Sequence, residues 1–249
     1  MTHNVKIPLI VLQTWKTTQI PSHWIPSQKG LKKHMSHWKY VLMTDEDNRN
    51  FCKKHFPDFL PYYDAFEYPI MRADAIRYMF LYVYGGLYID MDIEVRKPLD
   101  DLFYEDHDIY LARSGTFGSY YTNAFMASKP KQKFWLECIE EMKQPYKSWQ
   151  IGKHLKVMRS TGPLMLTSSV GKNENLDIGE LPEDLLGCSV CDPKPFYKEG
   201  NYVAILEGSS WIEADTKTYI FFTCYWKYVI FIVVILIVVY VISRNMRKT

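Results

Sequence analysis

The apolar residues of this chain fall into short runs separated by polar segments. The runs at Ile7–Trp15 and Trp38–Met43 have the length of buried strands. Thr44–Glu46 resembles a helix cap with an acidic first turn, which would open a helix over Asn48–His55. Because alternation of strand and helix is typical of α/β proteins, we expect a sheet that gathers ligands at the carboxyl ends of its strands.

Later segments continue this alternation. Pro163 is expected at an early helical position, and the polar stretch 171–179 is expected to be a loop. The pattern also predicts a helix at Gln132–Met142 and strands at Asp108–Arg113, Ala124–Ser128, Leu185–Val190 and Tyr202–Leu206.

The segment Arg72–Asp92 carries the most chemical information. Its first half has the spacing of an amphipathic helix, with Asp74 and Arg77 three positions apart on one face. Gly85 and Gly86 supply the left-handed conformations that end a helix and turn the chain. The apolar run that follows predicts a buried strand.

Two carboxylates belong to this predicted strand, Leu87–Ile93. Since side chains alternate along a strand, Tyr88, Asp90 and Asp92 are expected on one face. Burying two unpaired carboxylates is costly, and hard oxygen ligands favour magnesium, manganese or calcium. The pair therefore predicts a divalent ion bound to a diphosphate, with a D-x-D triplet that simply faces solvent as the alternative.

Composition narrows the function classes. The chain has 249 residues, 30 basic against 28 acidic side chains and a formal charge of +2, so we expect no polycationic surface for nucleic acid. Its apolar content suffices for one catalytic core. The C-x-x-C pair of Cys188 and Cys191 lacks the second pair that a structural zinc site needs, which leaves reduced thiols or one disulfide.

The C-terminal segment predicts a membrane anchor. Tyr228–Ser243 contains no charge, and at the helical rise its 16 residues span about 24 Å of the roughly 30 Å hydrocarbon core. Preceding residues complete the crossing, with Tyr225, Trp226 and Tyr228 at the interface. We therefore divide the chain into a catalytic domain, 1–218, a single-pass anchor, 219–243, and a short basic tail, 244–249.

The sidedness of this anchor is open. Arg244, Arg247 and Lys248 follow the span and oppose Lys217 and Lys227 before it, so the positive-inside rule favours a cytosolic tail. In a eukaryotic cell the catalytic domain would then occupy a Golgi-like endomembrane. The first residues do not form a convincing signal peptide, so a tail-anchored protein with a cytosolic domain is the alternative.

Six segments occur in an order that characterises one enzyme family. They are IPLIVLQTWKT from Ile7, WKYVLMTDED from Trp38, YPIMRADAIRYMFLYVYGGLYIDMDIEVRKPLDDL from Tyr68, and then NAFMASKP, STGPLMLT and GSSW. In these segments, which cover most of residues 7–212, the chain resembles glycosyltransferase family 32, and most closely its inositol phosphorylceramide mannosyltransferase branch. The resemblance implies a nucleotide-sugar-binding, Rossmann-like α/β sheet of the GT-A type.

The resemblance also implies roles for individual residues. Trp15 would lie against the nucleotide base, and Asp74 and Arg77 would contact the sugar. Asp90 would contact the ribose or the sugar, and Asp92 would bind manganese or magnesium. These four charged residues are the catalytic candidates.

Three later residues would complete the site that the resemblance implies. Asn123 would lie near the sugar or the acceptor. Ser209 and Trp211 would close over the diphosphate, and Ser209 would join Asp90 and Asp92 around the metal. The structural alternatives are a core tryptophan at the first strand, a salt bridge on the helix and a packed loop next to the membrane.

We therefore predict a metal-dependent, retaining glycosyltransferase. Its donor would be GDP-mannose, and its acceptor a membrane lipid such as an inositol phosphosphingolipid. A UDP-sugar donor with a glycan or glycoprotein acceptor is the second possibility. An inactive membrane-anchored scaffold is the third, because Leu12 and Ile212 stand where related chains usually carry histidine.

Overall fold

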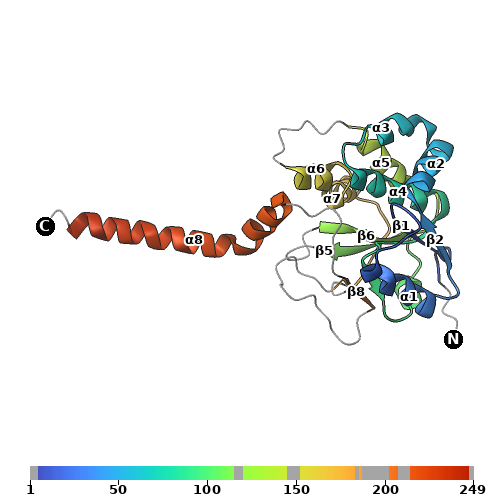
Figure 1. The fold of residues 1–249 in the computed structure, drawn as a ribbon, viewed down its shortest axis with the longest axis horizontal. Coiled ribbons are helices and arrows are strands. Elements are labelled where there is room, and N and C mark those ends of the chain that lie inside the picture. Colours follow the sequence, from blue (N-terminus) through green and yellow to red (C-terminus); the bar gives the residue numbers. More distant parts are fainter. Residues whose placement is uncertain are drawn as a thin grey trace.

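A mixed β-sheet lies at the centre of the molecule (Figure 1). This computed structural model describes residues 5–114, 120–144, 152–182, 185–186, 202–206 and 214–246. The strands are β1 (Ile10–Thr14), β2 (Lys39–Met43), β3 (Gly86–Ile89), β4 (Ile93–Val95), β5 (Ile109–Ser114), β6 (Tyr120–Ser128), β7 (Ile178–Glu180) and β8 (Val203–Ile205). Six of them form a sheet in the order β2-β1-β3-β6-β5-β7, while β4 and β8 form a separate antiparallel pair.

Helices cover both faces of this sheet. They are α1 (Ile25–His34), α2 (Asp45–His55), α3 (Leu60–Ala65), α4 (Pro69–Tyr84), α5 (Lys133–Glu141), α6 (Lys153–Ser160), α7 (Pro163–Gly171) and α8 (Ala214–Met246), with short 3-10 turns at Ser22–Trp24, Pro57–Phe59 and Asp100–Phe103. Helices α2, α3, α4, α5 and α7 pack on one face, and α1 with the β4–β8 pair packs on the other (Figure 1). Two apolar cores therefore sandwich the sheet, as the predicted α/β class requires.

Strand direction places one edge of the sheet in position for ligand binding. β1 pairs in parallel with both β2 and β3. The carboxyl ends of these three strands therefore meet side by side. Thr14, Thr44 and Asp90 stand at or just after those ends.

The turn from α4 into β3 needs glycine at two consecutive positions. Gly85 has φ of +66° and Gly86 has φ of +86°. A Cβ atom on Gly86 would lie 2.4 Å from the carbonyl oxygen of Ile10, so the close approach of β3 to β1 also requires glycine. The predicted glycine turn is confirmed.

The path of the chain after β3 differs from the prediction. The strand predicted over Leu87–Ile93 ends at Ile89, and the next residues turn, with the Ile93 amide donating to the Asp90 carbonyl at 3.1 Å. The chain then leaves the main sheet because β4 pairs with β8. The expectation that Asp90 and Asp92 share one face of a strand is therefore wrong.

Helix α4 also differs from the expected amphipathic helix. Its residues 74–81 are all buried, because α4 is covered by the sheet on one side and by α2, α5 and α6 elsewhere. Asp74 and Arg77 are each only 3% exposed. The charged pair therefore lies inside the protein, where solvent does not weaken it.

Most other predicted elements are present. The expected helices near residues 45–55, 132–142 and 163 correspond to α2, α5 and α7, and Thr44 and Asp47 form a reciprocal capping box at the start of α2. The expected strands near 108, 124 and 202 correspond to β5, β6 and β8, whereas the predicted loop 171–179 runs into β7. Leu185 and Leu186 form a bend and not a strand, and 187–190 lie outside the described residues, as do Cys188 and Cys191. The pattern of apolar and polar residues did not predict α1, α3 or α6.

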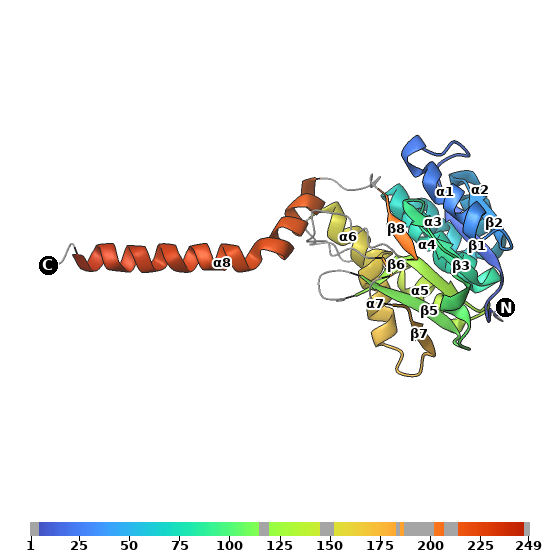
Figure 2. The same ribbon diagram turned by 90° about the horizontal axis from the view of Figure 1, so that it is seen from below.

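Helix α8 projects away from the body of the molecule (Figures 1 and 2). Its stretch Cys224–Val241 has a mean hydropathy of 2.4 and no buried residues, so it is long and apolar enough to cross a membrane. Ala214–Met246 is one helix. The predicted boundary between residues 218 and 219 falls within it, and that boundary stays a prediction.

Candidate active site

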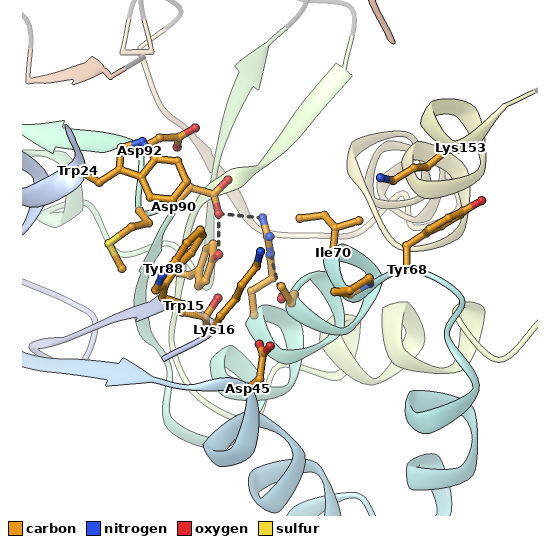
Figure 3. Close-up of a pocket in the computed structure, with 15 residues that line it drawn as sticks. Trp15, Lys16, Trp24, Asp45, Tyr68, Ile70, Tyr88, Asp90, Asp92 and Lys153 are labelled. Atoms are coloured by element: carbon orange, nitrogen blue, oxygen red, sulfur yellow. Dashed lines mark hydrogen bonds and ion pairs between the residues drawn. The ribbon is translucent and has the colours of Figure 1, made fainter. Parts of the chain in front are cut away.

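A cleft of about 240 Å³ opens where β1 and β3 end (Figure 3). We call it the strand-end cleft. The lining residues include Thr14, Trp15 and Lys16 after β1, Tyr88, Asp90, Met91 and Asp92 after β3, Tyr68, Pro69, Ile70, Ala73 and Arg77 along α4, and Trp24, Asp45 and Lys153. The position agrees with the expectation that ligands gather at the carboxyl ends of strands.

Arg77 is the structural centre of this cleft. Its guanidinium lies 2.9 Å from an Asp74 carboxylate oxygen, 3.2 Å from an Asp90 oxygen, and donates to the Asn123 carbonyl at 2.7 Å. It also lies 4.5 Å from the centroid of the Tyr88 ring. Burial alone would lower its pKa, but the neighbouring carboxylates outweigh burial and raise it. Arg77 is therefore a fixed positive charge.

Asp74 pairs with Arg77 on the side of the guanidinium that faces the protein interior. Its other contacts are the Thr161 hydroxyl, which donates at 2.7 Å, and the Asn123 amide, which donates at 3.0 Å. Burial raises the pKa of Asp74 to about 6, against the opposing effects of Arg77 and Thr161. Asp74 and Asn123 do not line the cleft. Their contacts fit residues that orient Arg77.

Asp90 faces the cleft with one oxygen already engaged. That oxygen accepts the Tyr88 hydroxyl at 2.6 Å and faces Arg77 (Figure 3). Its backbone is also fixed, because its amide donates to the Ala124 carbonyl at 2.8 Å and its carbonyl accepts from Gln13 at 3.2 Å. The carboxylate is thus oriented in advance, with its second oxygen left for a ligand.

Asp92 has the opposite environment. Within the described parts of the chain, its carboxylate has no ion pair and no hydrogen bond from another residue. Burial raises its pKa to about 7, and the nearby negative charge of Asp90 adds to this effect. Arg77 and the Asp92 backbone amide oppose this rise without cancelling it, and a buried carboxylate of this kind fits a cation ligand.

The donor set for a metal is incomplete within the described residues. They contain no group of three or more histidine, cysteine, aspartate or glutamate side chains able to hold an ion. Asp90 and Asp92 supply hard oxygen ligands, as magnesium and manganese require. Magnesium is usually bound by one or two carboxylates together with substrate phosphates, so this pair fits an ion that arrives with a diphosphate.

Two tryptophans form the other end of the strand-end cleft. The rings of Trp15 and Trp24 meet edge to face with centroids 4.7 Å apart, and Lys16 lies 5.5 Å from the Trp15 ring. Trp24 is buried, whereas Trp15 is only partly covered. The exposed part of Trp15 is therefore available for stacking against a flat ring.

The structure brings four of the predicted site residues to the cleft wall: Trp15, Arg77, Asp90 and Asp92. Ser209 and Trp211 lie outside the described residues. Sequence reasoning did not find Lys16, Trp24, Asp45, Tyr68, Ile70 and Lys153 as lining residues. Lys16, Asp45, Tyr68 and Ile70 lie within segments that carry the family resemblance, but no role was assigned to them, whereas Trp24 and Lys153 lie outside those segments.

Comparison with known proteins identifies the family. Residues 21–109, which contain α4, both glycines and the two aspartates, match the glycosyltransferase sugar-binding region containing the DXD motif. The chain belongs to glycosyltransferase family 32. Within this family it is 34% identical over 225 residues, or 90% of its length, to inositol phosphoceramide mannosyltransferase 2 of Schizosaccharomyces pombe. It is 37% identical over 214 residues, or 85% of its length, to mannosyl phosphorylinositol ceramide synthase SUR1 of Saccharomyces cerevisiae.

The matched relatives are longer than this family 32 chain. The matches span 64% of the Schizosaccharomyces protein and 53% of the Saccharomyces protein. Among solved structures, PaToxG glycosyltransferase superposes with a TM-score of 0.51, at 16% identity, over 67% of this chain and 69% of that chain. The similarity shows the fold, and the predicted GT-A architecture is confirmed.

Proposed function

We propose that this family 32 protein transfers mannose from GDP-mannose to the head group of an inositol phosphosphingolipid, with manganese or magnesium as cofactor. The observation that carries the proposal is the contrast between two neighbouring carboxylates in one cleft. Asp90 is fixed by Tyr88 and Arg77, whereas Asp92 forms no ion pair with any of the described residues. This combination suits a site that is completed when a metal-bound diphosphate arrives.

Asp90 and Asp92 would hold the metal. When bound, the ion would offset the negative charge that develops on the departing diphosphate. Arg77 adds a fixed positive charge to the same wall and prevents Asp90 from rotating away. Trp15 would carry the nucleotide base. Ser209 and Trp211 would close over the diphosphate, as the family resemblance implies.

The lipid acceptor is inferred from the relatives and from α8. The named relatives are an inositol phosphoceramide mannosyltransferase and a mannosyl phosphorylinositol ceramide synthase. Helix α8 carries the Cys224–Val241 stretch that would confine the cleft to the surface of a bilayer. Transfer to a lipid head group therefore accounts for both the site and the anchor.

We place the catalytic domain on the lumenal side of an endomembrane. The basic residues after the span favour a cytosolic tail, and Cys224 is disulfide-bonded. Disulfides persist in oxidising compartments and are rare in the cytosol. Protease treatment of sealed microsomes should therefore leave the domain intact until detergent opens them; digestion without detergent would reverse the orientation.

The experiment that tests the activity is a transfer assay on the full chain. GDP-mannose and UDP-sugars are supplied with inositol phosphoceramide in mixed micelles, with and without manganese.

Asp92→Asn should lower kcat/KM by at least about 100-fold, because a neutral amide cannot replace a charged ligand. A UDP-sugar as the preferred donor would support the second function predicted from sequence. No transfer, together with no binding of GDP or UDP in calorimetry, would support the inactive scaffold.

A further inference from the structure

The side of the strand-end cleft opposite Asp92 carries a second positively charged side chain. Figure 3 shows Lys153 and Tyr68 together on the side of the cleft away from Trp24 and Asp92. The Lys153 ammonium lies 5.3 Å from the centroid of the Tyr68 ring. An ammonium at this distance from a tyrosine face is held by attraction to the ring, which fixes the direction of a long, flexible side chain.

This wall is joined directly to the anchor helix. Lys153 is the first residue of α6, and the amide of its neighbour His154 donates to the Asp215 carboxylate at 2.8 Å. The Thr216 hydroxyl lies 3.2 Å from the His154 ring. Both Asp215 and Thr216 belong to the first turn of α8. The first turn of α8 is therefore hydrogen-bonded to the start of α6, the helix that carries Lys153.

The connection brings Lys153 close to the bilayer. Cys224, where the apolar stretch begins, follows Asp215 by nine positions, so the helical rise puts the junction at most about 14 Å from the hydrocarbon boundary. The head-group layer covers roughly 5–7 Å of that distance. A head group that extends outward from the bilayer can therefore reach the mouth of the cleft beside Lys153.

The other cations of the cleft are placed for different tasks. Arg77 is bound to Asp74 and Asp90, and Lys16 lies beside Trp15. Lys153 is the basic lining residue on the membrane side, within the described part of the chain. A lysine is a compact charge on a flexible stem, which suits a phosphate that approaches from more than one direction.

We propose that Lys153, steadied by Tyr68, binds the phosphodiester of the lipid acceptor and so selects acceptors with an anionic head group. The proposal rests on the transferase function proposed above. It gives the positive groups of the cleft separate tasks, with Arg77 and Lys16 on the donor side and Lys153 beside the acceptor phosphate. Tyr68 acts as a positioning residue.

A kinetic comparison tests this assignment in the full chain. In mixed micelles of inositol phosphoceramide, Lys153→Gln should raise the acceptor KM about 10-fold, which corresponds to about 1.4 kcal/mol, and leave the donor KM within about twofold. Lys153→Arg should restore most of the loss. The matched control is Lys143→Gln, because the Lys143 ammonium also lies over a tyrosine ring, 5.7 Å from the centroid of Tyr62, pairs with Glu140 and does not line the cleft.

Three results would overturn the assignment. They are a raised donor KM in Lys153→Gln, an equal effect of Lys143→Gln, or an equal loss with an acceptor that lacks phosphate. Binding of glycerophosphoinositol, a soluble phosphodiester with the same head group, provides a readout that does not need transfer. We expect Lys153→Gln to weaken this binding, with free inositol as the phosphate-free control. If binding depends on Lys153 but the parent enzyme transfers nothing, the proposed function fails and the anion site stands; if binding is unchanged, the site fails.

Discussion

Arg77 shows how the cleft obtains a fixed charge without exposing it. The guanidinium is 3% exposed, yet each of its charged partners comes from a different part of the chain, one on α4 itself and one after β3. Taking a charge out of water is costly unless it is paired and hydrogen-bonded. On the side of the guanidinium that faces the interior, the ion pair with Asp74 and the hydrogen bond to the Asn123 carbonyl offset that cost. The outer side is then available to orient Asp90.

The first prediction concerns the inner partner. Asp74→Asn keeps the shape of the side chain but leaves Arg77 buried without one of its counter-charges. Breaking a buried pair in this way should lower the free energy of unfolding by about 3 kcal/mol. Urea unfolding followed by tryptophan fluorescence in detergent measures the change.

The control is an exposed pair of the same chemistry. Arg49 and Asp64 form a bidentate salt bridge, with their side chains 50% and 41% exposed. Asp64→Asn should cost less than about 1 kcal/mol, because water screens the interaction. Equal costs for the two substitutions would mean that the Asp74 pair is not shielded from solvent as its burial implies.

At the scale of elements, the junction of α4 and β3 fixes the geometry of the site. Gly86→Ala forces a positive φ on alanine and drives a Cβ into the Ile10 carbonyl of β1. The conformational strain alone costs about 1–3 kcal/mol, and the clash adds to it. Thermal unfolding should therefore show a markedly lower Tm, or the chain should fail to fold.

Gly171→Ala is the matched substitution. Gly171 closes α7, and a Cβ there would meet nothing within 4 Å. Since alanine favours helix over glycine, this change should be neutral or should raise stability by up to about 1 kcal/mol. A loss of stability equal to that of Gly86→Ala would show that the α4–β3 turn is not the sensitive position.

The contact between α6 and α8 should respond to pH. Burial lowers the pKa of His154 below its ordinary value of 6.5, although the Asp215 carboxylate opposes the shift. The unfolded chain therefore binds more protons than the folded one just below pH 6.5. The contribution of His154 to stability is present above that value and is lost as pH falls towards the folded pKa.

Hydrogen exchange can measure this loss. Amides of α6, corrected for intrinsic rates, should exchange faster at about pH 5.5 than at about pH 7.5, and His154→Gln should remove the difference because glutamine does not titrate. The same acceleration in His154→Gln would assign the pH dependence to another group.

The elements that sequence reasoning found are those with strong local signals. The Thr44 cap marks the start of α2 and the two glycines mark the end of α4, and both signals can be read from neighbouring residues alone. The end of β3 was missed because its cause is distant: β4 leaves the sheet to pair with β8, more than a hundred residues later. Helix α6 has only eight residues and was not predicted, so Lys153 was not placed at the site.

Residues of the site could be predicted from the sequence only where a single segment of the chain contains them. The segment from Asp74 to Asp92 holds three of the four predicted residues that reach the cleft wall. The wall opposite is assembled from Tyr68 and Lys153, which are far apart in sequence and joined only by packing of α4 against α6. The spacing of residues within one segment of the sequence cannot predict a contact between two distant segments.

At the scale of the whole molecule, α8 is long and apolar enough to anchor the protein in a bilayer, and its first turn contacts α6, which carries one wall of the cleft. If the bilayer supplies the acceptor, removing the anchor should impair transfer to lipid and spare nucleotide binding. Ile232→Lys with Leu236→Lys places two charges at the centre of the apolar stretch, at a cost of about 5–7 kcal/mol for insertion. The substitutions lie far from α6, so the His154 contact with the first turn of α8 should persist.

Fractionation and kinetics together test this arrangement. The double variant should move from the alkali-resistant membrane pellet to the supernatant, bind GDP with manganese as the parent does, and lose transfer to inositol phosphoceramide in vesicles. Its transfer to soluble glycerophosphoinositol should persist, because the cleft itself is intact. Ile232→Val with Leu236→Val keeps the span apolar and serves as the control. If the double lysine variant stays in the pellet, another part of the chain must hold the protein to the membrane, and the link between α8 and acceptor delivery would be refuted.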